Sequence, residues 1–249
     1  MLKYKYELFT KKNSKSNDKP NEDAAVFNES HSIGLVLDGV SRDKEDGIYP
    51  NPSPAQIATQ LFAEACLHEA EQKRTSGIEK IQLMIRRGND ELREYNNRLN
   101  HRFPAGTVGI VFAIECDCFQ YGYIGDCYAT VIRDGMMRTF TECQTEMVVK
   151  HKGEFSSDNI RFDICNHISH PCGYGVWDGN QAAMDFVKYG TIGLLEGDVI
   201  LIYTDGFKAA ADSHKIDDLK HLPLNKIDEV NPDFGMDDRT CIRVSFEKV

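Results

Sequence analysis

Residues 33–39 have the sequence IGLVLDG, a short apolar run that ends in an acidic residue followed by glycine. A run of this kind indicates a buried strand, which would present the carboxylate of Asp38 at its tip. The pattern recurs, because acidic residues also adjoin apolar, strand-like runs at residues 22–23, Asp126, Asp205 and residues 237–238. Carboxylates at strand ends can gather at one rim of a sheet, so these five places are the main functional signal in the sequence.

The segments around these places differ in their hydrophobic period. Ser53 before Pro54 is typical of a helix start, and apolar residues at helical spacing follow it. A second apolar stripe predicts a helix over residues 78–99. The other regular segments are rich in β-branched and aromatic residues, which predicts strands at residues 24–27, 107–115, 119–125, 128–133, 138–140, 186–189, 199–203 and 240–246.

The connections between these segments indicate the fold class. Asp134-Gly135 lies between two predicted strands and predicts a hairpin turn. Residues 141–182 have no clear period, so we expect them to form an irregular, flap-like segment. Sequential short strands prefer hairpin pairing, which favours antiparallel sheets. The sequence therefore predicts a single α+β domain over residues 1–249.

Composition and charge exclude several classes of protein. The 249 residues include 29 Lys and Arg against 39 Asp and Glu, for a net charge of −10, which argues against nucleic acid as a partner. The longest apolar runs, such as residues 108–114, are far shorter than the ~20 residues of a membrane-spanning helix. The N-terminal segment lacks the apolar core of a signal peptide. We therefore expect a cytoplasmic protein with no membrane association, whose eight cysteines are reduced thiols.

Carboxylates gathered at one rim repel one another unless cations neutralise them. Mg²⁺ and Mn²⁺ prefer oxygen ligands, and two such ions about 3.5–4 Å apart can hold a phosphoryl group and activate a shared water. The simpler interpretation of any one acidic pair is a solvated turn, and we favour it for Asp134-Gly135. Five places in order along the chain favour a metal site.

The ordered motifs resemble those of the metal-dependent protein phosphatases of the protein phosphatase 2C (PPM) type. The series comprises NED at residues 21–23, LVLDG at 35–39, AGT at 105–107, YIGDC at 123–127, GD at 197–198, LIYTDG at 201–206 and DDRT at 237–240. It spans nearly the whole chain, and the two predicted helices follow its second motif. The resemblance implies a β-sandwich of two antiparallel sheets flanked by α-helices, in four αββα layers. It also implies hydrolysis of phosphoserine or phosphothreonine in proteins.

The same resemblance implies a binuclear Mn²⁺ or Mg²⁺ centre. Asp38 would bridge the two ions and also be catalytic, and the Gly39 carbonyl would bind one ion. The other implied positions are Asp205 and Asp237 on the second ion, Glu22 and the catalytic Asp23 acting through metal-bound waters, and Asp126 at a weaker third ion.

The chain departs from the family pattern at two positions that contact substrate. Val-Ser-Arg at residues 40–42 replaces the usual His-Gly-Gly, so the proton donor to the leaving group is unassigned. Asp18 stands where many members carry an Arg that holds the substrate phosphate. Arg42 is the favoured catalytic substitute, because a guanidinium can bind phosphate through two hydrogen bonds, and Lys19 and Lys15 are further candidates. A solvated loop Arg is the alternative interpretation of Arg42.

These departures leave alternative functions open. A catalytically weak member of the fold could bind phosphoproteins or act as a regulatory module, and a small-phosphoester hydrolase could use the same site. The complete acidic series favours an enzyme that acts on phosphorylated protein substrates of a Ser/Thr kinase. Residues 165–172 hold two Cys and two His, but their spacing matches no common zinc pattern, so packing is favoured over a zinc site.

Overall fold

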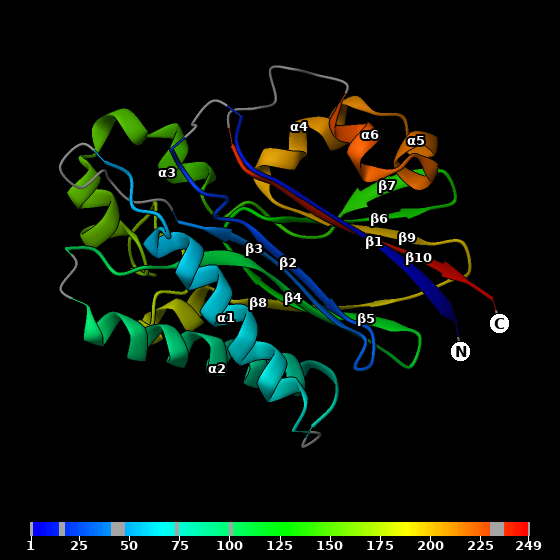
Figure 1. Cartoon of the computed structure of the whole chain (residues 1–249), viewed down its shortest axis with the longest axis horizontal. Coiled ribbons are helices and arrows are strands. Elements are labelled where there is room, and N and C mark those ends of the chain that lie inside the picture. The colour runs from blue at the N-terminus through cyan, green and yellow to red at the C-terminus, as the bar shows by residue number, and fades with distance from the viewer. Residues whose placement is uncertain are drawn as a thin grey trace.

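The computed structural model describes residues 2–14, 18–40, 48–72, 75–99, 102–229 and 237–248. In these ranges, two five-stranded antiparallel sheets pack face to face, and helices cover both outer faces (Figure 1). The four αββα layers confirm the sandwich that the sequence motifs imply. No helix in the described ranges has the length and apolar character needed to cross a bilayer.

Each sheet combines strands from distant parts of the chain. The first sheet has the order β2 (Ala24–Asn28), β3 (Ile33–Gly39), β4 (Thr107–Glu115), β5 (Cys118–Ile124) and β8 (Lys188–Gly193). The second has the order β1 (Lys3–Lys11), β10 (Arg239–Glu247), β9 (Val199–Tyr203), β6 (Tyr128–Arg133) and β7 (Met136–Thr139). The first and last strands therefore pair along their whole length, from Lys3 opposite Glu247 to Lys11 opposite Arg239.

Two long helices cover the first sheet, and three short helices cover the second (Figure 1). The long helices are α1 (Pro54–Ala70) and α2 (Gly77–Arg98), and the short ones are α4 (Asp205–Ser213), α5 (Ile216–His221) and α6 (Leu224–Asp228). Helix α1 begins as predicted: Pro54 occupies the first turn, and Ser53 Oγ accepts a hydrogen bond from the Gln56 N–H at 3.1 Å.

Strand β9 shows why the sandwich has two apolar cores. Ile200 and Ile202 are buried in the core between the sheets, which continues to α1 and α2. Leu201 and Tyr203 are buried with Phe207 in a second core under α4, α5 and α6. Successive side chains of a strand point to opposite faces, so a strand covered on both faces is apolar at every position.

Two strand predictions need correction at their ends. The turn at Asp134-Gly135 joins β6 to β7 as predicted, with φ of 51° and 71°, but β7 starts at Met136 rather than at residue 138. Residues 186–187 were predicted to open a strand. Phe186 instead ends a 3-10 helix (Gln181–Phe186), and its burial at that turn gives it a strand-like apolar signal.

Residues 141–182, called the flap below, contain more regular structure than the sequence predicts. Helix α3 (Glu146–Lys150) opens the flap and is followed by a 3-10 turn (Lys152–Glu154) and a π-helical turn (Asn159–Ile164). These elements are only three to six residues long. Segments that short are below the length at which a helical period can be recognised.

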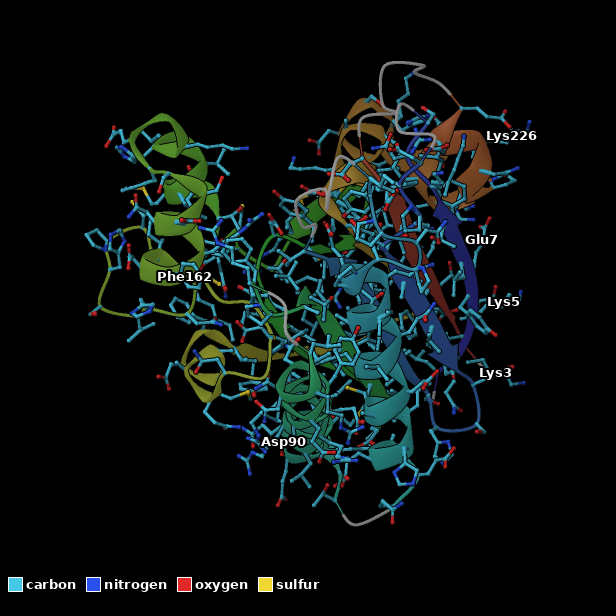
Figure 2. All side chains as sticks on the ribbon, turned by 60° about the vertical axis from the view of Figure 1, so that its left-hand side comes forward. Lys3, Lys5, Glu7, Asp90, Phe162 and Lys226 are labelled. Carbon is cyan, nitrogen blue, oxygen red and sulfur yellow. The ribbon has the colours of Figure 1, made fainter. Side chains whose placement is uncertain are left out.

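The flap is bonded to β4 at Trp177, which exchanges two backbone hydrogen bonds with Thr107, each at 2.9 Å, and it is also bonded internally. The Asn166 side chain accepts a hydrogen bond from the Val176 N–H at 2.8 Å and donates one to the Val176 carbonyl at 2.9 Å. Figure 2 shows the flap, marked by Phe162, on the opposite side of the molecule from Lys3 and Glu7 of β1. The flap thus lies at one end of the sandwich, away from the paired first and last strands.

Candidate metal centre

A cavity of about 300 Å³ lies between the ends of several strands and the start of the flap. The carboxylates among its described lining residues belong to Asp38, Asp126, Asp205 and Asp237. Asp38 is near the end of β3, whereas Asp126 precedes β6 and Asp237 precedes β10. Strands β6 and β10 are the antiparallel neighbours of β9, so their starts lie beside the end of β9, which Asp205 follows. Asp38 comes from the facing sheet. The structure therefore gathers four of the predicted residues around one cavity.

The turn that carries Asp38 is held by close backbone packing. The Thr107 hydroxyl donates a hydrogen bond to the Asp38 carbonyl at 2.7 Å. A Cβ atom on Gly39 would lie 2.7 Å from the Glu22 carbonyl oxygen and 3.0 Å from that of Ala55, so glycine is required here. This packing fixes the main chain on both sides of the Asp38 side chain.

A second glycine places Asp205 beside Asp237. Asp205 is the first residue of α4, and a Cβ atom on Gly206 would lie 2.0 Å from the Asp238 carbonyl oxygen. Helix α4 therefore packs directly against the start of β10. Because only glycine allows this approach, the Asp-Gly pair at residues 205–206 is more than a turn signal.

Asp238 has a structural role that the sequence does not reveal. Its two carboxylate oxygens accept hydrogen bonds from the N–H groups of Asn13 and Glu22, each at 2.7 Å, and its side chain is buried. Asp238 thereby ties the segment before β2 to the start of β10. The acidic pair at residues 237–238 is visible in the sequence, but only the fold shows that Asp237 lines the cavity and Asp238 is buried.

We expect Asp238→Ala to lower the free energy of unfolding by roughly 3 kcal/mol, because two buried N–H groups lose their carboxylate acceptor. Urea unfolding of the metal-free protein measures this change. Asp237→Ala is the matched control, since Asp237 is exposed at the cavity rim. Equal destabilisation by both substitutions would contradict the role assigned to Asp238.

Asp23 and Asp126 are each held by a threonine. Asp23 Oδ2 accepts a hydrogen bond from Thr204 Oγ1 at 2.9 Å, and Asp126 Oδ2 accepts one from Thr145 Oγ1 at 2.9 Å. Thr204 immediately precedes Asp205, so the first bond connects two predicted site residues. Thr145 immediately precedes α3, so the second bond connects Asp126 to the flap.

Glu22 is engaged by protein groups outside the cavity lining. Its buried carboxylate accepts hydrogen bonds from Tyr49 Oη at 2.6 Å and from Ser53 Oγ, and it forms an ion pair with Lys19 at 2.9 Å. Burial by itself favours the neutral form of Lys19, but the Glu22 carboxylate and the charge of Asp237 outweigh it and raise the pKa of Lys19. The Lys19 ammonium is therefore charged and held at Glu22.

The carboxyl groups at the cavity have raised pKa values, because they are buried and lie close to one another. Burial, followed by the negative charges of Asp23 and Asp205, raises the pKa of Asp38 well above its usual range. Burial, followed by the charges of Asp126 and Asp237, raises the pKa of Asp205 to about 7. Burial also raises the pKa of Asp126. Without a cation, these groups disfavour full ionisation near neutral pH, and a divalent cation would offset the repulsion.

The donor set of the cavity suits Mn²⁺ or Mg²⁺. Carboxylate oxygens and a carbonyl oxygen are the hard ligands that these ions prefer. Among the described residues, no three Asp, Glu, His or Cys side chains converge closely enough to hold an ion by themselves. Mg²⁺ usually keeps several waters when it binds to one or two carboxylates, so this spacing fits a partly hydrated ion.

The segment rich in Cys and His supports the packing interpretation. Cys172 is buried in a small apolar cluster with Val148 and Ile164, and its N–H donates to His170 Nδ1 at 3.0 Å. All eight cysteines of the chain are free thiols. These contacts stabilise the flap internally.

The candidates for binding the substrate phosphate have different outcomes. Arg42 and Lys15 lie outside the described residues, and Lys19 is paired with Glu22. Lys152 of the flap lines the cavity, and sequence reasoning missed it. A single lysine in a segment without a clear hydrophobic period cannot be recognised as a site residue from the sequence alone.

Comparison with known proteins gives a fold relationship. No protein-family model and no curated protein matches the sequence. The serine/threonine phosphatase PstP of Mycobacterium tuberculosis matches with a TM-score of 0.74 and 17% identity, over 100% of both chains. The PPM Ser-Thr phosphatase MsPP from Mycobacterium smegmatis matches with a TM-score of 0.66 and 17% identity, over 98% of both chains.

A structure of the PstP catalytic domain in complex with two manganese ions also matches, with a TM-score of 0.72 and 16% identity over 100% of both chains. Identities this low establish a shared fold. The chain therefore has the fold of the bacterial PPM-type serine/threonine phosphatases over essentially its whole length.

Proposed function

We propose that the protein hydrolyses phosphoserine and phosphothreonine in other proteins, with two Mn²⁺ or Mg²⁺ ions as cofactors. One observation carries this proposal: carboxylates from separate elements, among them Asp38, Asp126 and Asp205, surround a single cavity in a fold shared with serine/threonine phosphatases. The PstP structure with two manganese ions supports the choice of cofactor. The raised pKa values at the site support cation binding there.

Each site residue has a distinct role in this proposal. Asp38 would be a ligand of both ions, and the Gly39 carbonyl would bind one of them. Asp205 and Asp237 would bind the second ion. The remaining assignments are Glu22 and Asp23 through water, Asp126 at a weaker third ion, and Arg42 as a candidate phosphate ligand. When bound, the cations would lower the pKa of a shared water and neutralise the phosphoryl oxygens.

The chain itself orients the reactants. Thr204 donates a hydrogen bond to the Asp23 carboxylate, which in this proposal would orient an attacking water. Thr107 and the close packing at Gly39 hold the main chain beside Asp38. Preorganised groups of this kind lower the barrier because they need no rearrangement during the reaction.

The complete acidic set favours turnover over phosphoprotein binding alone. A binding module would gain nothing from buried carboxylates that repel one another and also repel a phosphate dianion. All four cavity carboxylates are present in the described structure. The phosphatase is therefore the favoured function. The binding module and the small-phosphoester hydrolase are the alternative outcomes of the test.

The test is phosphate release from a phosphothreonine peptide by chelator-treated protein, with and without added Mn²⁺. We expect release only with the metal. p-Nitrophenyl phosphate, assayed in parallel, distinguishes a small-ester hydrolase, which would cleave it and leave the peptide intact. No release from either substrate by folded, Mn²⁺-treated protein would overturn the proposal.

A further inference from the structure

The flap contributes a positive charge to the cavity. Among the described residues that line the cavity, Lys152 is the only basic one. It faces the same space as Asp38 and Asp205, although it comes from a segment more than a hundred residues from Asp38 in sequence. The flap is therefore part of the cavity wall.

Lys152 is available to bind a ligand. The residue is exposed, and in the described part of the chain no carboxylate forms an ion pair with it. Lys19, the one predicted alternative that falls in the described ranges, is held at Glu22. Lys152 thus has the free ammonium that an incoming anion requires.

We propose that Lys152 binds the phosphoryl group of the substrate, so that the flap supplies the cation that the N-terminal segment lacks at Asp18. This inference rests on the proposed phosphatase function and names a binding residue for it. A phosphate dianion that approaches several carboxylates is repelled by them, and a nearby ammonium offsets part of that repulsion.

The structure explains how Lys152 is held in place. The Thr145 hydroxyl donates to the Asp126 carboxylate at 2.9 Å, which fixes the start of α3 at the cavity. Val148 and Val149 of α3 line the cavity, and Lys152 follows one turn after Val148. Lys152 begins the 3-10 turn (Lys152–Glu154) that follows α3, and in this position it lines the cavity together with Val148 and Val149.

Apart from Thr145, which is bonded to Asp126, the other flap residues in the described lining are apolar or aromatic. Val148, Val149, Ile160, Tyr174 and Val176 form a wall beside Lys152. Such a wall has no competing hydrogen-bond acceptors in its aliphatic side chains. A phosphoryl group would therefore find Lys152 as the charged group on the flap side and the cavity acids, with their cations, on the other side.

The experiment compares Lys152→Ala with Lys150→Ala, a matched control two residues away that ends α3 and does not line the cavity. Two readouts are measured on Mn²⁺-loaded protein. One is kcat and KM for a phosphothreonine peptide, and the other is the Kd of inorganic phosphate by isothermal titration calorimetry. Phosphate binding needs no turnover, so it reports on Lys152 even if peptide hydrolysis fails.

We expect Lys152→Ala to raise KM and the phosphate Kd roughly tenfold or more, with kcat changed less than about threefold, as for a lost charged hydrogen bond. Lys152→Arg retains the charge and should restore most of the binding. Lys150→Ala should behave as the wild type.

The outcomes separate the two proposals. Weaker phosphate binding by Lys152→Ala without any peptide hydrolysis by the wild type would support Lys152 and overturn the phosphatase function. Normal hydrolysis with unchanged KM and phosphate Kd in Lys152→Ala would overturn the role of Lys152. If Arg42→Ala alone weakened binding, the phosphate ligand would be Arg42, and the inference about Lys152 would be wrong.

Discussion

Asp38→Asn is expected to reduce Mn²⁺-dependent phosphate release by roughly a thousandfold or more, because an amide cannot replace a carboxylate shared by two cations. Asp38 has the largest expected effect because it lies among the other acids: after burial, the charges of Asp23 and Asp205 are the main causes of its raised pKa. Its main chain is held by Thr107 and by the packing of Gly39, so the substitution should leave the fold unchanged. Steady-state kinetics with a phosphothreonine peptide measures the loss.

Asp134→Asn is the matched control for this substitution. Asp134 also precedes a glycine, but it lies in the β6–β7 turn with a φ of 51°, a conformation that Asn adopts readily. This variant should retain full activity and stability. Circular dichroism spectra of both variants check the fold, and wild-type activity in folded Asp38→Asn would remove Asp38 from the site.

The second large effect concerns the stability of the protein with and without metal. A ligand that binds only the folded state at 1,000 times its Kd stabilises that state by about 4 kcal/mol. For a chain of this size, 1 kcal/mol corresponds to a Tm change of about 2–4 °C, so Mn²⁺ at that excess should raise Tm by roughly 8–16 °C. Differential scanning calorimetry measures the shift, and added chelator should reverse it.

The metal-free protein should also lose stability as pH rises. The folded-state pKa of Asp205 is raised to about 7, and that of Asp38 is raised as well, above the values near 4 of an unfolded chain. Such groups stabilise the fold fully below the unfolded pKa, and this contribution is lost as pH rises through the folded pKa. We therefore expect the metal-free Tm to fall between pH 5.5 and pH 8.

Protons and metal compete for the same carboxylates, so the Mn²⁺-induced rise in Tm should be larger at pH 8 than at pH 5.5. Asp205→Asn cannot ionise at that position and should show a weaker dependence of the metal-free Tm on pH. A metal-free Tm that is constant over this range would show that the cavity acids do not repel one another as the structure indicates.

The strands buried on both faces could be predicted to the residue. Strands β4, β6 and β9 have the predicted bounds, because each is a run of β-branched and aromatic residues that ends abruptly at polar ones. The predicted start of β8 was too early, because Phe186 is buried at the end of a 3-10 helix and not in the strand. Apolar residues in the sequence indicate that a segment is buried. They do not show whether the buried segment is a strand or a helical turn.

The candidate site could be predicted from the sequence only in part. Asp205 follows β9, and Asp126 precedes its antiparallel neighbour β6, so the convergence of these two follows from strand pairing. Asp38 ends a strand of the facing sheet, and only the packing of the two sheets brings it to the same cavity. The roles of Asp238 and Lys152 depend on contacts between segments far apart in sequence. Asp238 binds the N–H groups of Asn13 and Glu22, and Lys152 reaches the cavity through the path of the flap. No local pattern encodes such contacts.

The position of β10 has a consequence for synthesis of the protein. This strand lies between β1 and β9, and the residue that precedes it by two positions is Asp237. During translation, the first strand emerges long before its partner, and the second sheet stays divided until the last strand arrives. A nascent chain would therefore hold Asp38, Asp126 and Asp205 without the residue that completes them. The proposed metal site would therefore be complete only after β10 has left the ribosome and joined β1 to β9.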